Sequence, residues 1–385
     1  MTQQDDTDKP RSSPFRSAIV DEARLGGNVL NLPGGQIILP RVFGFCRGVE
    51  RALEMLQRAC DRQAGGRFFL LGQIIHNPWV NRYFEGRGVQ ILGAGEIDRL
   101  EELVRAADCA VIPAFGVRPD VMRRLRAIGC QVVDTSCGDV RRLWAWAQRA
   151  SREGCGVMVF GRADHDETVV TKNLLAECPG GRYVIAGSLE KVAQFCRLVT
   201  GEMPEADFVR LFDSQSTNSR DIAPFGRLAQ VSQTTMLYSQ TMTVRRMLTE
   251  AFERRFGADE AARRLSFQPT VCRATQDRQA AAVELCQSRP DVTIVVGGFG
   301  SSNTRHLYEL ARQYSAAYFI EDATAIRSAD VLSTVHFEAD RQQAGSEIRG
   351  WLPAGRPLRI AVLAGASTPE SVVGEVIDRL AGFLR

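Results

Sequence analysis

Hydrophobic and polar residues follow one another along this chain in a pattern that occurs three times. In each copy an apolar segment leads into a cysteine, and an amphipathic helix begins almost at once. A buried strand, a polar loop and a helix follow, then further strands, one of which ends in a turn of small residues. Alternating apolar strands and amphipathic helices predict parallel sheets covered by helices. We therefore predict an α/β fold of three pseudo-repeated units in a trefoil-like arrangement.

The three copies also give the expected domain boundaries. We expect units at residues 39–136, 137–271 and 272–385, preceded by an N-terminal tail or extension over residues 1–38. The second copy is longer than the others, and its excess, near residues 195–226, is predicted to be a surface insertion. The opening sequence, MTQQDDTDKPRSSP, lacks the apolar centre of a signal peptide and is predicted to be disordered.

The cysteine that opens each copy is the first candidate for chemistry. These residues are Cys46, Cys137 and Cys272, each at a strand or loop end where a helix starts. A helix N-terminus presents free N–H groups and the positive end of the helix dipole, which we expect to lower the thiol pKa. Three thiolates at equivalent repeat positions can converge on one iron–sulfur cluster. Three ligands leave one iron open for Lewis-acid chemistry, which indicates a reductase.

Polar residues in the turns form a candidate anion pocket. Ser301, Ser302 and Asn303 follow a Gly-rich strand end and precede a helix, so their hydroxyl and N–H groups could bind phosphate oxygens. Ser367 lies in the equivalent turn after the last strand, and His76 lies in the first copy. For any one of these short motifs, capping of a helix N-terminus is the alternative interpretation.

Composition and charge narrow the class of protein. A hydrophobic content of 44% with 24% charged residues is ordinary for a soluble globular enzyme. The net charge of +3 is too small to indicate a nucleic-acid or anionic-membrane partner. No apolar run approaches the roughly 18 residues of a membrane-spanning helix. Ten cysteines without an export signal indicate a reducing compartment, so we expect a cytoplasmic protein with thiols or metal ligands rather than disulfides.

A series of motifs carries a resemblance to a known family. The motifs are GFCRGVERA, IIHN, DTSC, the His165-x-Glu167 pair, SQTT, DRQ, GSSN and GAST. From about Leu39 onwards, the chain resembles the LytB family of 4-hydroxy-3-methylbut-2-enyl diphosphate reductases. The resemblance implies a [4Fe–4S] cluster with three cysteine ligands and one open iron, which takes the substrate hydroxyl before two electrons and two protons remove it as water. It also implies a ferredoxin or flavodoxin electron donor. The chain has no nucleotide-binding fingerprint, so bound NADPH is not expected.

The resemblance also assigns roles to single residues. It places six in the diphosphate site: His76, His165, Ser301, Ser302, Asn303 and Ser367. Glu167 matches the glutamate of the family's proton relay, and Thr234 matches the threonine beside the substrate alcohol. A carboxylic acid in a dry cavity can supply the proton that a leaving hydroxyl needs, so Glu167, Thr234 and His165 are the candidate catalytic residues. Glu167 could instead cap a helix, since residues 164–167 resemble a helix start.

Several residues depart from the family pattern near the expected pocket. Phe115 stands where the family has a histidine. The other departures are Arg162, Asp164, Gly138 after Cys137, and Arg273, Gln276 and Asp277 after Cys272. Arg162 could replace the lost histidine as a bidentate phosphate partner. Phe115 could equally line a pocket for a larger apolar substrate.

Three hypotheses for the function follow. The first is reductive dehydroxylation of the family's allylic diphosphate. The second is the same two-electron chemistry on another alcohol, without a diphosphate if the pocket has changed. The third is a non-catalytic iron–sulfur redox sensor or carrier. Glu167 and Thr234 argue against the third, because a carrier needs no proton relay.

Overall fold

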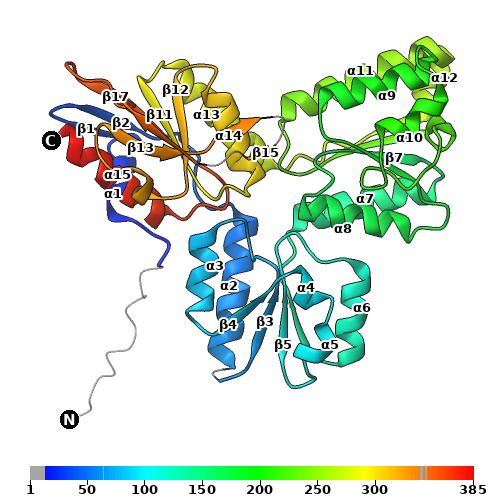
Figure 1. Cartoon of the computed structure of the whole chain (residues 1–385), viewed down its shortest axis with the longest axis horizontal. Helices are drawn as coiled ribbons and strands as arrows, with labels where there is room; N and C mark the ends of the chain where they lie inside the picture. Colours follow the sequence, from blue (N-terminus) through cyan, green and yellow to red (C-terminus); the bar gives the residue numbers. More distant parts are fainter. Residues whose placement is uncertain (1–13, 64, 339–340, 343–344) are drawn as a thin grey trace. The chain divides into compact units, whose positions relative to one another are not determined.

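The structure is a computed structural model of the chain that describes residues 14–63, 65–338, 341–342 and 345–385 (Figure 1). The start that is predicted to be disordered lies almost entirely outside these residues. The chain divides into two compact units, residues 46–277 and residues 1–45 with 278–385. The expected boundaries at residues 39, 137 and 272 stay predictions.

The first sheet of the unit formed by residues 46–277 has the strand order β4-β3-β5-β6, and all neighbours are parallel. Its central strands are continuously apolar because helices cover both faces. Phe69, Leu71 and Ile112 are at most 3% exposed and pack with Leu125 of α6. The elements are α2 (Arg47–Arg62), β3 (Phe68–Leu71), α3 (Pro78–Glu85), β4 (Val89–Leu92), α4 (Ala94–Ile97), α5 (Leu100–Leu103), β5 (Cys109–Ile112), α6 (Pro119–Ile128) and β6 (Gln131–Asp134).

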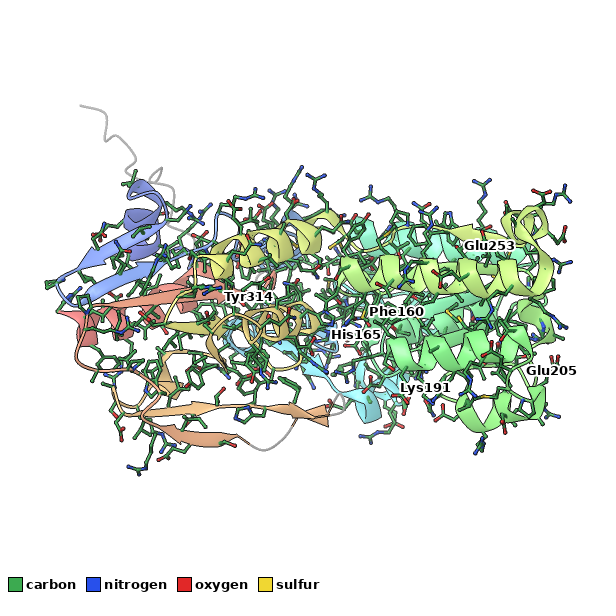
Figure 2. The ribbon with its side chains drawn as sticks, turned by 90° about the horizontal axis from the view of Figure 1, so that it is seen from above. Phe160, His165, Lys191, Glu205, Glu253 and Tyr314 are labelled. Atoms are coloured by element: carbon green, nitrogen blue, oxygen red, sulfur yellow. The ribbon has the colours of Figure 1, made fainter. Side chains whose placement is uncertain are left out.

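The second sheet of the same unit has the order β10-β9-β7-β8, again all parallel. Figure 2 shows Phe160, at the end of β7, inside this unit, whereas the exposed Glu205 and Glu253 lie at its outside. The elements are α7 (Gly138–Arg152), β7 (Gly156–Phe160), α8 (Asp166–Ala176), β8 (Tyr183–Ala186), α9 (Leu189–Thr200), η1 (Glu205–Asp207), α10 (Phe208–Leu211), η2 (Ala223–Gly226), β9 (Leu228–Ser232), α11 (Tyr238–Phe256), α12 (Ala258–Arg264) and β10 (Leu265–Phe267), followed by α13 (Arg273–Gln287).

The third sheet lies in the other unit and has the order β1-β2-β17-β11-β12. Only the β1–β2 pair is antiparallel. The elements are α1 (Ala18–Leu25), β1 (Val29–Leu32), β2 (Gly35–Ile38), β11 (Val292–Val296), α14 (Ser302–Ala311), β12 (Ala316–Ile320), η3 (Ala323–Ala325), β13 (Val331–Thr334), β14 (Phe337–Glu338), β15 (Arg341–Gln342), β16 (Ser346–Arg349), β17 (Leu358–Ala364) and α15 (Glu370–Leu384). In the described part of the chain, no helix is both long and apolar enough to cross a membrane.

Part of the predicted N-terminal extension is folded onto this third sheet. Helix α1 packs against α15, and a Cβ atom at Gly374 would lie 1.9 Å from Ser17 Oγ. Arg24 of α1 forms an ion pair with Glu370 at the start of α15. The extension therefore covers the C-terminal helix and adds the β1–β2 hairpin to the sheet.

The three larger sheets share one order over four strands, which confirms the predicted α/β repeat; the described residues also form the two-stranded sheets β13-β16 and β14-β15. The orders β4-β3-β5-β6, β8-β7-β9-β10 and β12-β11-β17-β2 are equivalent along the chain, except that β2 comes from its start. The fourth strand of each row is β6, β10 or β2, and the segment after it contains the repeat cysteine. Because all four strands are parallel, each cysteine follows the carboxyl end of its sheet, where ligands bind in folds of this kind.

Residues 195–226, predicted to be a surface insertion, are exposed at many positions but are also anchored in the core. Four phenylalanines of this segment are at most 2% exposed and belong to the core beside the second sheet: Phe195, Phe208, Phe212 and Phe225. Their ring centroids lie 5.4 to 6.2 Å apart. Phe208 and Phe212 are spaced like residues on one face of a helix, but polar turns separate this pair from Phe195 and Phe225, so the sequence does not show that all four rings meet.

This packing predicts unequal effects at two neighbouring positions. Phe208→Ala should lower the free energy of unfolding by about 3–5 kcal/mol, the usual cost of deleting a buried ring. Val209→Ala is the matched control, because Val209 is 53% exposed and should change stability by less than about 0.5 kcal/mol. Urea denaturation followed by circular dichroism measures both. Equal effects of the two substitutions would contradict a core role for the segment.

Candidate functional site

Each of the three predicted cysteines lies at a helix N-terminus. Cys46 and Cys137 are the N-cap residues of α2 and α7. Cys272 immediately precedes α13, and its Sγ accepts a hydrogen bond from the Thr275 N–H at 3.4 Å. The predicted position of these thiols is therefore confirmed, whereas their role as ligands is untested and stays a prediction.

The three sulfur atoms share one neighbourhood. A Cβ atom at Gly48, in the first turn of α2, would lie 2.7 Å from Cys137 Sγ and 3.7 Å from Cys46 Sγ. Negative charge at Cys46 raises the pKa of both Cys137 and Cys272, so the third thiol lies within electrostatic range of the first. Because residue 48 is a glycine, no side chain fills the space next to the sulfur atoms of Cys46 and Cys137.

The expected lowering of the thiol pKa is wrong for two of these cysteines. Burial raises the pKa of Cys137, and it raises that of Cys272 to about 11. Backbone N–H groups of the following helix turn act in the opposite direction but have a smaller effect. Desolvation of the thiolate therefore exceeds the effect of the helix terminus in the metal-free protein, and metal binding would have to displace the thiol protons.

Two of the cysteines are tied to the turns that follow the third strands of the sheets. The Cys137 N–H donates to the carbonyl oxygen of Ala114, after β5, at 2.8 Å. The Cys272 N–H donates to the carbonyl oxygen of Thr234, after β9, at 3.0 Å. Ala114 and Thr234 occupy the same position, two residues beyond the end of their strands. The repeat therefore places both cysteines by the same backbone hydrogen bond.

Thr234 also holds the carboxyl group of Glu167, which is 2% exposed. The Thr234 N–H donates to Glu167 Oε1 at 2.6 Å, and the Thr234 hydroxyl donates to Oε2 at 2.5 Å. Burial raises the pKa of Glu167 to about 7, although the two hydrogen bonds lower it in part. Glu167 lies in the first turn of α8, as the capping alternative requires, but its side chain is directed to Thr234. A carboxyl group with this pKa can donate a proton near neutral pH.

Two histidines and Phe115 form an aromatic group beside this carboxyl. The ring of Phe115 stacks on His76 at 4.3 Å between centroids, and His76 meets the edge of His165 at 5.3 Å. His165 Nδ1 accepts a hydrogen bond from the Glu167 N–H at 3.2 Å, and Figure 2 shows His165 near the end of β7. His76 Nε2 lies 3.6 Å from Asp166 Oδ2, and burial lowers the His76 pKa. Phe115 thus fixes the His76 ring and supplies no polar group.

Arg162 is engaged with a carboxylate of its own loop. Its Nε and one terminal nitrogen donate to the two carboxylate oxygens of Asp164 at 3.0 and 2.8 Å. The Arg162 N–H donates to Gln233 Oε1 at 3.2 Å. The Nε edge of the guanidinium therefore meets Asp164, and a phosphate that bound this edge would have to compete with that carboxylate.

The remaining four predicted residues lie together in the other unit. Ser301 caps α14, and its Oγ accepts hydrogen bonds from the Thr304 N–H at 3.3 Å and the Ser367 hydroxyl at 3.3 Å. Ser302 is 8% exposed and Asn303 only 2%. Neither amide atom of Asn303 has a hydrogen-bond partner among the described residues. A helix N-terminus with hydroxyls and a buried amide suits an anion.

A family model described as "LytB protein" matches residues 37–381. The chain belongs to the LytB family. It is 31% identical over 377 residues to the 4-hydroxy-3-methylbut-2-enyl diphosphate reductase of Gloeobacter violaceus, covering 95% of this chain and 87% of that protein. The protein of the same name from Gloeothece citriformis is 29% identical over 381 residues, with 98% and 92% covered. The family resemblance of the sequence is thus confirmed.

Two solved structures share the fold of this LytB-family chain. One is an (E)-4-hydroxy-3-methyl-but-2-enyl diphosphate reductase, with 24% identity and a TM-score of 0.52 over 90% of this chain and 99% of that one. The other is the E-1-hydroxy-2-methyl-but-2-enyl-4-diphosphate reductase from Plasmodium falciparum, with 19% identity and a TM-score of 0.62 over 89% and 86%. Both confirm the predicted fold class.

Three residues near the LytB-family motifs were missed at the level of sequence. Gly48 has no side chain to fill the space next to the Cys46 and Cys137 sulfur atoms. The sequence indicates it only by its position two residues after Cys46 in the first motif. Gln233 joins the Arg162 loop to Thr235, to which its amide donates at 2.7 Å. Asp139 raises the pKa of Glu167, a long-range effect for which the sequence gives no signal.

The raised pKa of Glu167 predicts a pH-dependent stability. The carboxyl has an ordinary pKa of 4.5 and a pKa of about 7 in the folded protein, so between these values only the unfolded chain releases its proton. The stability that the neutral form contributes is therefore present below about pH 4.5 and is lost as the pH rises to 7, by about 3 kcal/mol. Glu167→Gln cannot ionise and should lose less stability over this range in urea denaturation. The matched control is Glu250→Gln, at an exposed ion pair of α11. Wild-type behaviour of both variants would contradict the buried acid.

Proposed function

We propose that the chain reduces 4-hydroxy-3-methylbut-2-enyl diphosphate to isopentenyl and dimethylallyl diphosphate. The C–O bond of the allylic alcohol breaks, two electrons and two protons are consumed, and the oxygen leaves as water. The observation that carries this proposal is the buried Glu167–Thr234 pair, which is joined through the Thr234 backbone to Cys272. Family relatives with the corresponding name support the choice of substrate.

Cys46, Cys137 and Cys272 would hold a [4Fe–4S] cluster. Within the described ranges, no three His, Cys, Asp or Glu side chains are grouped so that they could hold a single metal ion. A cluster of several irons joins thiolates that are further apart than the ligands of one ion. When bound by three cysteines, such a cluster supplies electrons and one open iron that acts as a Lewis acid.

Glu167 would supply the proton for the leaving oxygen. Its burial keeps the carboxyl neutral up to about pH 7, so a proton is available under the conditions of the reaction. The Thr234 hydroxyl contacts the same carboxyl at 2.5 Å and can pass the proton on. The two Thr234 hydrogen bonds hold the acid in one orientation, which reduces the ordering that the reaction needs.

The diphosphate would bind hydroxyl, amide and imidazole groups. Ser301, Ser302, Asn303 and Ser367 suit its oxygens because they surround the N-terminus of α14. The unpartnered amide of Asn303 gains a hydrogen bond when an anion is present. We propose His76 and His165 as further phosphate donors. Phe115 would hold the His76 ring and donate no hydrogen bond, and a phosphate at the Nε edge of Arg162 would have to displace Asp164.

The electrons would come from a ferredoxin or a flavodoxin in the cytoplasm. All ten cysteines are free of disulfides, which is typical of proteins from a reducing compartment.

The decisive experiment is anaerobic turnover of 4-hydroxy-3-methylbut-2-enyl diphosphate with a chemical reductant. Protein that holds its full iron content should form both products, and the rate should fall by roughly a hundredfold in Glu167→Gln, the usual scale for a lost general acid. No turnover by iron-replete protein would overturn the proposed substrate and favour a different alcohol. An unchanged rate in Glu167→Gln would mean that the proton comes from another group.

Iron content tests the ligand assignment. Replacement of Cys46, Cys137 or Cys272 by Ser should strongly deplete the roughly four irons expected per chain, because serine is a poor ligand for iron–sulfur clusters. Cys286→Ser, at a buried core position, and Cys60→Ser are the controls and should retain iron. Full iron content in the three ligand variants would contradict the assignment.

A pair of glycines tests the space in front of the thiols. Gly48→Ala places a methyl group 2.7 Å from Cys137 Sγ, so the variant should bind little iron. Gly138→Ala is the matched control, because it also lies in the first turn of a helix after a cysteine, but its Cβ meets nothing within 4 Å. Assays of iron and acid-labile sulfide, together with the visible absorbance of the cluster, measure the cluster content of both variants. Equal iron content in the two variants would show that the thiols do not bind a group in this space.

A further inference from the structure

A surface cavity of about 550 Å³ reaches Cys272 from the outside of the unit formed by residues 46–277. One wall is formed by residues of α7 between Asp139 and Arg149. The other wall is the segment from Gln268 to Arg273, which joins β10 to α13. Cys272 itself lies in the wall. The cavity therefore connects the protein surface with one of the three proposed cluster ligands, and nothing in the proposed chemistry of the substrate uses it.

The charged residues of this cavity are mainly basic. They are Arg142, Arg149, Arg273 and Asp139, three positive charges against one negative charge. The three arginine side chains are 81%, 76% and 85% exposed. Such exposure allows them to reach a partner without being moved out of the protein core.

Arg142 pairs with Asp139, which also lines the cavity, whereas Arg149 and Arg273 pair with exposed carboxylates outside it. Arg149 contacts Glu153 at 2.9 Å and Arg273 contacts Asp277 at 2.8 Å, in both cases one turn away. Exposed pairs of this kind contribute about 0.3–0.5 kcal/mol. A carboxylate of a partner can therefore replace the helix carboxylate with little loss, and neither Glu153 nor Asp277 lines the cavity.

Apolar side chains line the same cavity as the arginines and form what we call its apolar floor. Leu143, Trp146, Pro269 and Val271 line the same cavity, and Trp146 is half-buried against the core of the second sheet. A tryptophan surrounded by arginines is the composition that protein interfaces favour at their centre. A small inorganic reductant needs no such floor, whereas a protein partner buries it.

We propose that this cavity is the docking surface for an acidic one-electron carrier protein, which reduces the cluster from the Cys272 side. The inference rests on the proposed function, because that reaction consumes two electrons per turnover. Two reduced carrier molecules dock in turn and are each oxidised by one electron, and the two protons come from solvent, one of them through the acid group of the site. The rate of electron transfer falls steeply with distance, so a carrier gains from contact beside a ligand of the cluster.

The experiment uses the full chain with its cluster and a reduced plant-type ferredoxin as the acidic probe. Arg149→Glu reverses a charge in the cavity wall. Cluster reduction by ferredoxin, followed by absorbance in a stopped-flow instrument at low salt, should slow by roughly tenfold, and the Kd from calorimetry should rise by a similar factor. The difference should shrink at about 0.5 M salt because the charges are then screened. Arg149→Lys should behave like the wild type.

Arg58→Glu is the matched control, because Arg58 is 69% exposed and pairs with Glu54 one turn away on α2, outside the cavity. It should alter the ferredoxin rate by less than about twofold. Reduction by methyl viologen, which needs no docking, should be the same in all variants. Equal ferredoxin rates for Arg149→Glu and Arg58→Glu, or an equal loss with methyl viologen, would overturn the docking surface. A failure of the proposed function would give a different result. In that case the wild-type protein itself would hold no cluster, or it would not convert the substrate with methyl viologen as the reductant.

Discussion

The backbone hydrogen bond that ties a repeat cysteine to the turn after a third strand is the constraint on which the candidate site depends. Cys137 is held in this way by Ala114, and Cys272 by Thr234. Parallel strands bring these turns and the cysteine-bearing helices to the same edge of each sheet. Thr234 uses its carbonyl for Cys272 and its N–H and hydroxyl for Glu167. One residue thus fixes the distance between a proposed metal ligand and the proposed acid.

Burial sets the chemistry of the groups that this constraint brings together. It raises the pKa of Glu167 to about 7, which makes a carboxylic acid available at neutral pH. The same effect raises the pKa of Cys272 to about 11, which opposes the thiolate that a metal requires. A metal bound by these cysteines would have to displace their protons, so its affinity would depend on pH. Burial thus favours the neutral acid at Glu167 and disfavours the thiolate at Cys272.

The sequence predicted the repeat because its signal is periodic, with apolar strands, a cysteine and a helix in each copy. It did not show that β2, from the start of the chain, completes the third sheet beside β17, since pairing between distant segments has no local pattern. The buried rings of residues 195–226 were also missed, because Phe208 and Phe225 are separated by polar turns whose composition alone indicates a surface. The periodic pattern of the chain therefore predicts the helices and strands of each copy. It does not predict contacts between segments that are far apart in the sequence.

At the site, motifs located the residues but not their partners. Phe115 is predicted as a pocket wall, and it does line a cavity of about 250 Å³ with Leu71 and Val121, but its stacking on His76 has no signal in the sequence. Arg162 is predicted as a phosphate ligand, and the Nε edge of its guanidinium meets Asp164 two residues later. Gly48 carries no side chain, so its importance is apparent only from the 2.7 Å that would separate a Cβ atom at this position from Cys137 Sγ. Side-chain orientation decides these cases, and a sequence pattern does not contain it.

Three cysteines, one from each repeat copy, would hold a cluster with one iron that has no protein thiolate. Mössbauer spectroscopy of the protein loaded with ⁵⁷Fe distinguishes this iron from the other three. We expect two kinds of iron in a ratio of about three to one, and only the minor signal should change when the substrate alcohol is added. Four irons that all keep thiolate-like parameters, unchanged by the alcohol, would contradict it.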